Sequence, residues 1–216
     1  MFFQRFRDQK GNRVPLASAT NAARALVYAA LRVGTGFRPA APSISQTAAR
    51  RMSALLPKTA RIAEFGSGLS TVWFARHFAE VVSVEHEAHW AKLVTDKLRA
   101  EKRDNATYLV KPVADYESAI DTYPDGYFDL ILVDGLKRDL CLQHAFPKLK
   151  DGGYIYLDNT DADIGIEDGE MRRTERLLLD AVRTSGGSIE YFTDFAPINF
   201  FAEQGALARI GGARTR

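Results

Sequence analysis

The chain alternates short apolar runs with longer amphipathic stretches, a pattern typical of strands and helices in turn. The helices are predicted near residues 72–78, 88–101, 136–149 and 170–184. The apolar runs predict strands at residues 62–65, 81–84, 108–113, 128–135, 154–159, 189–192 and 199–202. Strand and helix recurring five times predicts an α/β fold with a doubly wound, mostly parallel sheet, which binds ligands at the carboxyl ends of its strands.

The residues before the first strand predict a separate helical extension. Residues 20–33 form a helical pattern that the GlyThrGly turn at 34–36 ends, and the Pro-rich residues 38–42 read as a linker. Ser43 followed by Gln46 predicts a capping box for a second helix. We therefore predict a basic N-terminal helical extension at 1–42 and a Rossmann-like domain at 43–216.

Charge is distributed unevenly between these parts. Residues 1–61 hold eleven Lys or Arg and the single acid Asp8, a net charge of +10, which leaves −8 for the rest of a chain whose net charge is +2. A basic extension favours an anionic partner, and anionic lipid, nucleic acid and the acidic body itself are the candidates. A homodimer and a mitochondrial leader also stay open.

Cysteine usage bears on the compartment. Cys141 is the only cysteine, so no intrachain disulfide can form and a reducing compartment such as the cytoplasm is expected. The apolar run 22–33 is short and interrupted by two arginines, which argues against a membrane span. We expect a cytoplasmic protein, with peripheral attachment to a membrane as an alternative.

The stretch 61–71 combines a buried strand, a glycine turn and the start of a helix. Gly66, Ser67 and Gly68 leave backbone N–H groups open to a ligand, and Ser70 or Thr71 is expected to cap the helix.

Two features of this loop argue against a dinucleotide. The third glycine of a dinucleotide fingerprint would fall at Thr71, and Glu64 would repel a pyrophosphate but suit an ammonium group. S-adenosylmethionine carries such an ammonium. The second strand ends at Glu85, at the spacing where this fold places a carboxylate for ribose hydroxyls, and His86 beside it is expected to line the same pocket.

Glu64, Gly66 and Gly68 resemble the first motif of class I S-adenosylmethionine-dependent methyltransferases. The resemblance implies a sheet of about seven strands with the last strand antiparallel. It also implies that the turn around Asp115 contacts the adenine ring.

Asp134, Asp158 and Asn159 form a second group of polar residues at neighbouring strand ends. Three oxygen donors suit Mg²⁺. With Lys137, the pattern is similar to that of metal-dependent catechol and caffeoyl-CoA O-methyltransferases, which implies that a metal and Lys137 activate a substrate hydroxyl, with Asp134 also catalytic. The chain departs from that family at 138–140, where it lacks the usual aromatic residue.

A second resemblance covers roughly residues 43–203. The sequence GluPheGlySerGly with SerThr, and AspGly followed by Arg138, is similar to small bacterial methyltransferases and implies no metal. In this case Asp134 faces the methionine end of the cofactor or the substrate. Both resemblances predict an enzyme that transfers a methyl group from S-adenosylmethionine to a small molecule, preferentially at oxygen.

Three alternatives stay open. The first is an NAD-dependent oxidoreductase on the same fold, although no catalytic Tyr/Lys or His/Asp pair is evident. The second is a methyltransferase of RNA or of a membrane-associated substrate that the basic extension would deliver. The third is a non-catalytic binding protein, which the fold itself does not exclude.

Overall fold

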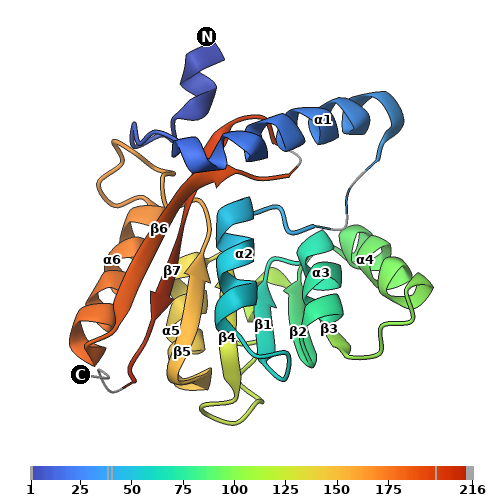
Figure 1. The fold of residues 1–216 in the computed structure, drawn as a ribbon. Helices are drawn as coiled ribbons and strands as arrows, with labels where there is room; N and C mark the ends of the chain where they lie inside the picture. The colour runs from blue at the N-terminus through green and yellow to red at the C-terminus, as the bar shows by residue number, and fades with distance from the viewer. Residues whose placement is uncertain (1, 38, 40, 198, 213–216) are drawn as a thin grey trace.

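The computed structural model describes residues 2–37, 39, 41–197 and 199–212, and it places seven strands in one sheet (Figure 1). Their order is β3-β2-β1-β4-β5-β7-β6. The first five strands are parallel, and β7 is antiparallel to both of its neighbours, so the predicted fold class is confirmed. The strands are β1 Arg61–Phe65, β2 Glu80–Glu85, β3 Ala106–Val110, β4 Phe128–Val133, β5 Leu149–Leu157, β6 Ser188–Phe195 and β7 Ala202–Arg209.

Helices cover both faces of this sheet. The α-helices are α1 Ala19–Thr35, α2 Gln46–Leu55, α3 Leu69–His77, α4 Ala88–Ala100, α5 Arg138–Lys148 and α6 Glu170–Ser185. Within the described residues, the short 3₁₀ helices η1 Phe2–Phe6 and η2 Leu16–Ser18 precede α1, and η3 Val113–Asp115 lies between β3 and β4.

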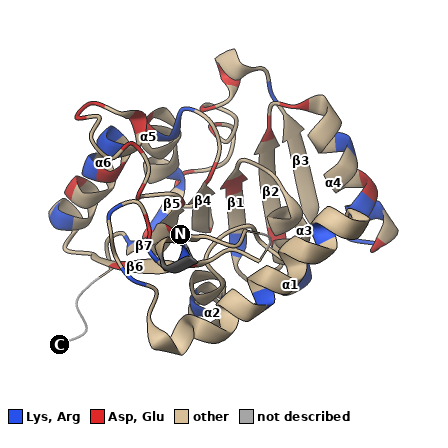
Figure 2. Cartoon of the chain, turned by 90° about the horizontal axis from the view of Figure 1, so that it is seen from above, with Lys and Arg blue, Asp and Glu red and all other residues tan. Residues whose placement is uncertain are grey.

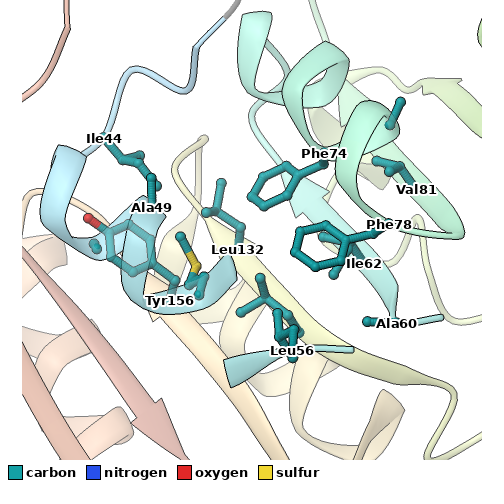
Figure 3. Packing of buried hydrophobic residues seen from close by; sticks show 14 of the residues in the cluster. Ile44, Ala49, Leu56, Ala60, Ile62, Phe74, Phe78, Val81, Leu132 and Tyr156 are labelled. Atoms are coloured by element: carbon teal, nitrogen blue, oxygen red, sulfur yellow. The ribbon is translucent and has the colours of Figure 1, made fainter. Parts of the chain in front are cut away.

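The core has two layers because successive strand residues point to opposite faces. Ile62 packs with Phe74 of α3 in the layer that α2, α3 and α4 cover (Figure 3). Its neighbour Ala63 packs in the other layer, with Leu142 of α5 and Leu178 of α6. Burial on both faces explains why the central strands are almost entirely apolar.

Several predicted boundaries are wrong. Helix α2 is capped by Ser45, whose Oγ accepts the N–H of Ala48 at 3.1 Å, and not by Ser43. Strand β5 comprises residues 149–157 and not 154–159. The last strand comprises residues 202–209 and not 199–202.

The N-terminal residues pack on the β6 side of the sheet. Phe6 meets Phe195 edge to face, with ring centroids 5.1 Å apart. Asn21 of α1 donates to Asp194 at 2.7 Å, and Lys10 pairs with Glu175 at 2.7 Å. These contacts join the extension to the sheet, and the predicted division at residue 42 stays a prediction. In the described part of the chain, no helix has both the length and the apolar character needed to cross a membrane.

Candidate functional site

The glycine loop between β1 and α3 has the geometry that its sequence predicts. Gly66 has a φ of +92°, and a Cβ there would lie 2.6 Å from the carbonyl oxygen of Asp134. Only glycine fits this position. The N-cap of α3 is Gly68 and not Ser70 or Thr71. The Thr71 hydroxyl instead accepts the Gly68 N–H at 3.3 Å, and Ser70 is buried in the first turn.

Glu64 is a fully buried carboxyl group beneath this loop. Its Oε2 accepts hydrogen bonds from Thr71 at 2.6 Å and from Ser83 at 3.0 Å. Among the described residues, its Oε1 has no hydrogen-bond partner. Burial raises the pKa of Glu64 to about 7, and the surrounding hydroxyls oppose this only in part. An unpaired buried oxygen is costly, so this atom is suited to a positively charged ligand group.

Glu85 joins the end of β2 to the glycine loop. Its Oε1 accepts the backbone N–H groups of His86 at 2.7 Å and Glu87 at 2.9 Å. Its Oε2 accepts the Ser67 hydroxyl at 2.8 Å, while Trp90 donates its indole N–H to the Ser67 carbonyl at 2.7 Å. The carboxylate is thereby held at the position predicted for binding a ribose.

A cavity of about 370 Å³, called here the loop cavity, opens between the glycine loop and Glu85. It is lined by Gly66, Ser67, Glu85, His86, Glu87, Trp90, Tyr116, Asp134, Gly135 and Leu136. Asp115 is exposed and does not line it. Its neighbour Tyr116 does, with a buried hydroxyl that has no partner among the described residues. Trp90 of α4 also lines the cavity and is not among the residues predicted for this site, because its spacing in a helical pattern carries no signal of this role.

Asp134, Asp158 and Asn159 meet at the ends of β4 and β5, as predicted, but an arginine lies between them. Arg138 donates through Nη2 to Asp134 Oδ1 at 3.3 Å and to Asn159 Oδ1 at 3.2 Å, and through Nη1 to the Asp158 carbonyl at 2.8 Å. The Asp158 carboxyl group instead accepts the Tyr156 hydroxyl at 2.9 Å.

This donor set does not fit a magnesium ion. The guanidinium takes the oxygens of Asp134 and Asn159, and the Asp158 carboxyl oxygen Oδ1 accepts from a neighbouring hydroxyl, whereas Mg²⁺ needs such oxygens turned toward it. Within the described ranges, no three His, Cys, Asp or Glu side chains are grouped to hold a metal. Burial raises the pKa of Asp134, and the Arg138 charge opposes that shift.

Lys137, predicted as a base beside Asp134, lies elsewhere. It is the N-cap of α5 with a left-handed backbone (φ +48°), and its Nζ bonds both carboxylate oxygens of Glu117 at 3.1 and 2.8 Å. The structure therefore groups Asp134 with Arg138 and not with Lys137. The sequence signal for Arg138 was its position three residues after the AspGly pair at 134–135.

A second cavity of about 330 Å³, called here the acceptor cavity, adjoins the loop cavity and shares Gly135 and Leu136 with it. Arg138, Asn159 and Glu203 line it together with Gln9 of the N-terminal segment. Burial raises the pKa of Glu203 to about 8. Two cavities that meet beside Gly135 allow two ligands to contact each other.

Comparison with known proteins identifies this part of the chain. Residues 63–160 match the model of a family described as a methyltransferase domain. These residues are therefore similar to a methyltransferase domain. The predicted resemblance to class I S-adenosylmethionine-dependent methyltransferases is thereby confirmed.

Solved structures share the fold of this methyltransferase domain. The O-methyltransferase TomG from Streptomyces achromogenes, in complex with S-adenosylmethionine, has a TM-score of 0.65 at 20% identity, over 88% of this chain and 90% of TomG. An O-methyltransferase from Bacillus cereus, in complex with S-adenosylhomocysteine, has a TM-score of 0.65 at 19% identity, over 96% and 99%. An rRNA methylase from Streptococcus thermophilus has a TM-score of 0.57 at 11% identity, over 77% and 95%.

These three proteins share the fold, although one is named as involved in tomaymycin synthesis and another as an rRNA methylase. A search among curated proteins gave no match. The acceptor of this methyltransferase domain therefore has to be inferred from its own residues.

Proposed function

We propose that this protein transfers a methyl group from S-adenosylmethionine to an oxygen atom of a small molecule. The observation that carries the proposal is the junction of the loop cavity and the acceptor cavity beside Gly135. The acceptor cavity, at about 330 Å³, has the volume of a small-molecule site. The O-methyltransferases from S. achromogenes and B. cereus support oxygen as the methyl acceptor.

The loop cavity fits the cofactor. Beneath the glycine loop that lines the cavity, the unpartnered Oε1 of Glu64 suits the ammonium group, and the bare backbone of Gly66 allows close approach to the loop N–H groups. Glu85 is placed for the ribose hydroxyls, and Tyr116 with His86 forms the wall for the adenine ring. When bound, S-adenosylmethionine supplies a methyl group on a positively charged sulfur.

On the acceptor side, the chain's own residues orient a hydroxyl and take its proton. Arg138 holds Asp134 at 3.3 Å and is itself held by the Gly135 carbonyl at 3.0 Å. Asp134 lines the loop cavity and Arg138 lines the acceptor cavity, so the pair lies at their junction. We assign Asp134 as proton acceptor and Arg138 as the cation that stabilises the acceptor oxygen as negative charge develops on it.

Calorimetric titration of the full chain with S-adenosylmethionine, with NADH as control, tests the cofactor. Micromolar affinity for S-adenosylmethionine and none for NADH is expected, because Glu64 repels a pyrophosphate. Binding of NADH alone would support the oxidoreductase alternative. A panel of phenolic and hydroxylated small molecules, with labelled cofactor, then tests the acceptor, and label found only on amines or RNA would contradict an oxygen acceptor on a small molecule.

A further inference from the structure

Helix α1 has an apolar side that nothing in the described structure covers. Its buried residues, Asn21, Ala22 and Ala25, all lie in its first two turns. The side chains of Leu26, Val27, Leu31 and Val33 are exposed, by 50, 56, 40 and 89%. Large apolar side chains exposed in one patch mark a binding surface.

The geometry of the helix groups these residues. At 100° per residue, the four exposed side chains fall in one arc on the side of α1 opposite to Asn21 and Ala25, with Leu26 and Val33 toward one edge of the arc and Val27 and Leu31 toward the other. Figure 1 shows α1 lying across the top of the molecule, running from the upper end of β6 toward the side of α3 and α4. The apolar side therefore points away from the body.

The charge of α1 indicates what binds its apolar side. Asp8 is the only acid before Glu64, so α1 and the linker after it carry arginines such as Arg24 and Arg32 with no acidic residue between them. Figure 2 shows blue and no red on α1. Two copies of this helix packed on one another would bring like charges together, whereas an anionic surface complements them.

A cavity of about 500 Å³ lies beside the helix, between α1, α2 and α3. Arg24 and Arg50 line it, with Ala49, Pro42 and Trp73, and no acidic residue does. Arg50 contacts only neutral oxygens in the described structure, at 3.2 Å from Asn21 Oδ1 and 3.2 Å from Thr47 Oγ1. Guanidinium groups beside an apolar floor suit the phosphate of a lipid headgroup and the start of its acyl chain.

We infer that α1 and this cavity bind the surface of an anionic lipid bilayer. The helix lies in the plane of the interface, with Val27 and Leu31 inserted among the acyl chains and Arg24 and Arg32 at the phosphate level. The inference concerns a surface apart from the loop and acceptor cavities, so it does not depend on the methyl acceptor.

Vesicle sedimentation with the full chain tests it. Binding to vesicles of phosphatidylcholine with about a third phosphatidylglycerol is expected, with at least tenfold weaker binding to phosphatidylcholine alone. The double variant Val27→Asp and Leu31→Asp is expected to lose binding by more than tenfold. Arg24→Gln and Arg32→Gln should each weaken it about fivefold and reduce its salt dependence.

The matched control is Ile166→Asp, which places the same charge at an equally exposed apolar residue (59%) in the loop before α6. It should bind vesicles as the unaltered protein does. Calorimetry with S-adenosylmethionine checks that every variant is folded and separates failure here from failure of the proposed function.

Three outcomes would overturn the inference. One is equal loss of vesicle binding in the Ile166 control, and another is no preference for anionic vesicles. The third is binding of another partner in place of vesicles. It would be seen as a dimer in light scattering that Val27→Asp and Leu31→Asp dissociate, or as RNA binding that they abolish while vesicle binding is absent.

Discussion

The loop cavity and the acceptor cavity share a wall but are built in different ways. The loop cavity is lined by residues at or after the ends of β1, β2 and β4, together with Tyr116, and its Ser67 and Glu85 are held by neighbours within the β1–α4 segment. The acceptor cavity joins residues as distant as Gln9 and Glu203. Changes in the first should therefore act on cofactor binding, and changes in the second on turnover.

The largest expected effect is that of Gly66→Ala. Its Cβ would lie 2.6 Å from a backbone oxygen that cannot move without β4, so both stability and cofactor binding should suffer. We expect a loss of roughly 3 kcal/mol or more in the free energy of unfolding, measured by urea denaturation. Gly126→Ala is the matched control, since it has a φ of +66° but no atom within 4 Å, and should cost only about 1–2 kcal/mol. Equal costs would show that the contact with Asp134 is unimportant.

Arg138→Met tests the acceptor cavity. Removing a guanidinium with four hydrogen-bonded partners should lower kcat by roughly a hundredfold and leave affinity for S-adenosylmethionine within about threefold. Arg138→Lys should recover part of kcat, because it restores the charge without the fork of donors. Equal losses of cofactor affinity and kcat would contradict the separation of the two cavities.

Arg138→Met also tests whether a metal binds at Asp134 and Asn159. In the unaltered protein, Arg138 occupies the oxygens that Mn²⁺ would need, so electron paramagnetic resonance should detect no bound Mn²⁺ and EDTA should not change turnover. In Arg138→Met these oxygens are released, and Mn²⁺ binding is expected to emerge. Tight Mn²⁺ binding to the unaltered protein, abolished by Asp158→Asn, would restore the magnesium site predicted from the sequence.

Glu64→Gln tests the protonation of Glu64 through the pH dependence of the protein's stability. The folded protein holds the Glu64 proton up to a pKa of about 7, whereas the unfolded chain releases it near 4.5. This group therefore makes the stability of the free protein fall as pH rises from 4.5 to 7, and the fall should be smaller in Glu64→Gln. Chemical denaturation of both proteins at a series of pH values measures the difference.

Cofactor affinity should show the opposite trend. An ammonium group favours the charged carboxylate, so affinity for S-adenosylmethionine should rise with pH through about 7, and binding should release a proton. Glu64→Gln should bind about tenfold more weakly at pH 8 and lose this dependence. If the variant kept the full pH dependence, the ammonium would have to bind another group.

The difference between the cavities also explains what the sequence predicted. Apolar runs and a glycine loop are local signals, so β1 to β5 and the turn between β1 and α3 were located from the sequence. Strand β7 was misplaced because its composition is poor in β-branched residues, and pairing with β5 and β6 stabilises it instead. Gly205 in this strand leaves room for the Tyr156 hydroxyl, which no local pattern reveals.

Arg138 shows the same limit on the acceptor side. Its role depends on Asn159, which follows a different strand and lies 21 residues further along the chain. The sequence placed carboxylates at the correct strand ends but offered two adjacent cations, Lys137 and Arg138, with no means of telling which one turns toward them. The backbone decides, because the left-handed Lys137 precedes the first turn of α5 and Arg138 lies within it.

Lys137→Met is therefore the smallest expected effect. The Lys137 ammonium is paired with Glu117 and is 30% exposed, and such partly exposed pairs contribute about 0–1 kcal/mol. We expect kcat and cofactor affinity to stay within about threefold of the unaltered protein, with Glu117→Gln as the matched control because it breaks the same pair from the other side. A loss of kcat in Lys137→Met as large as that in Arg138→Met, with Glu117→Gln unaffected, would mean that Lys137 leaves Glu117 and turns toward the acceptor during turnover. Lys137 rather than Arg138 would then act on the acceptor, as the resemblance to the metal-dependent O-methyltransferases implies.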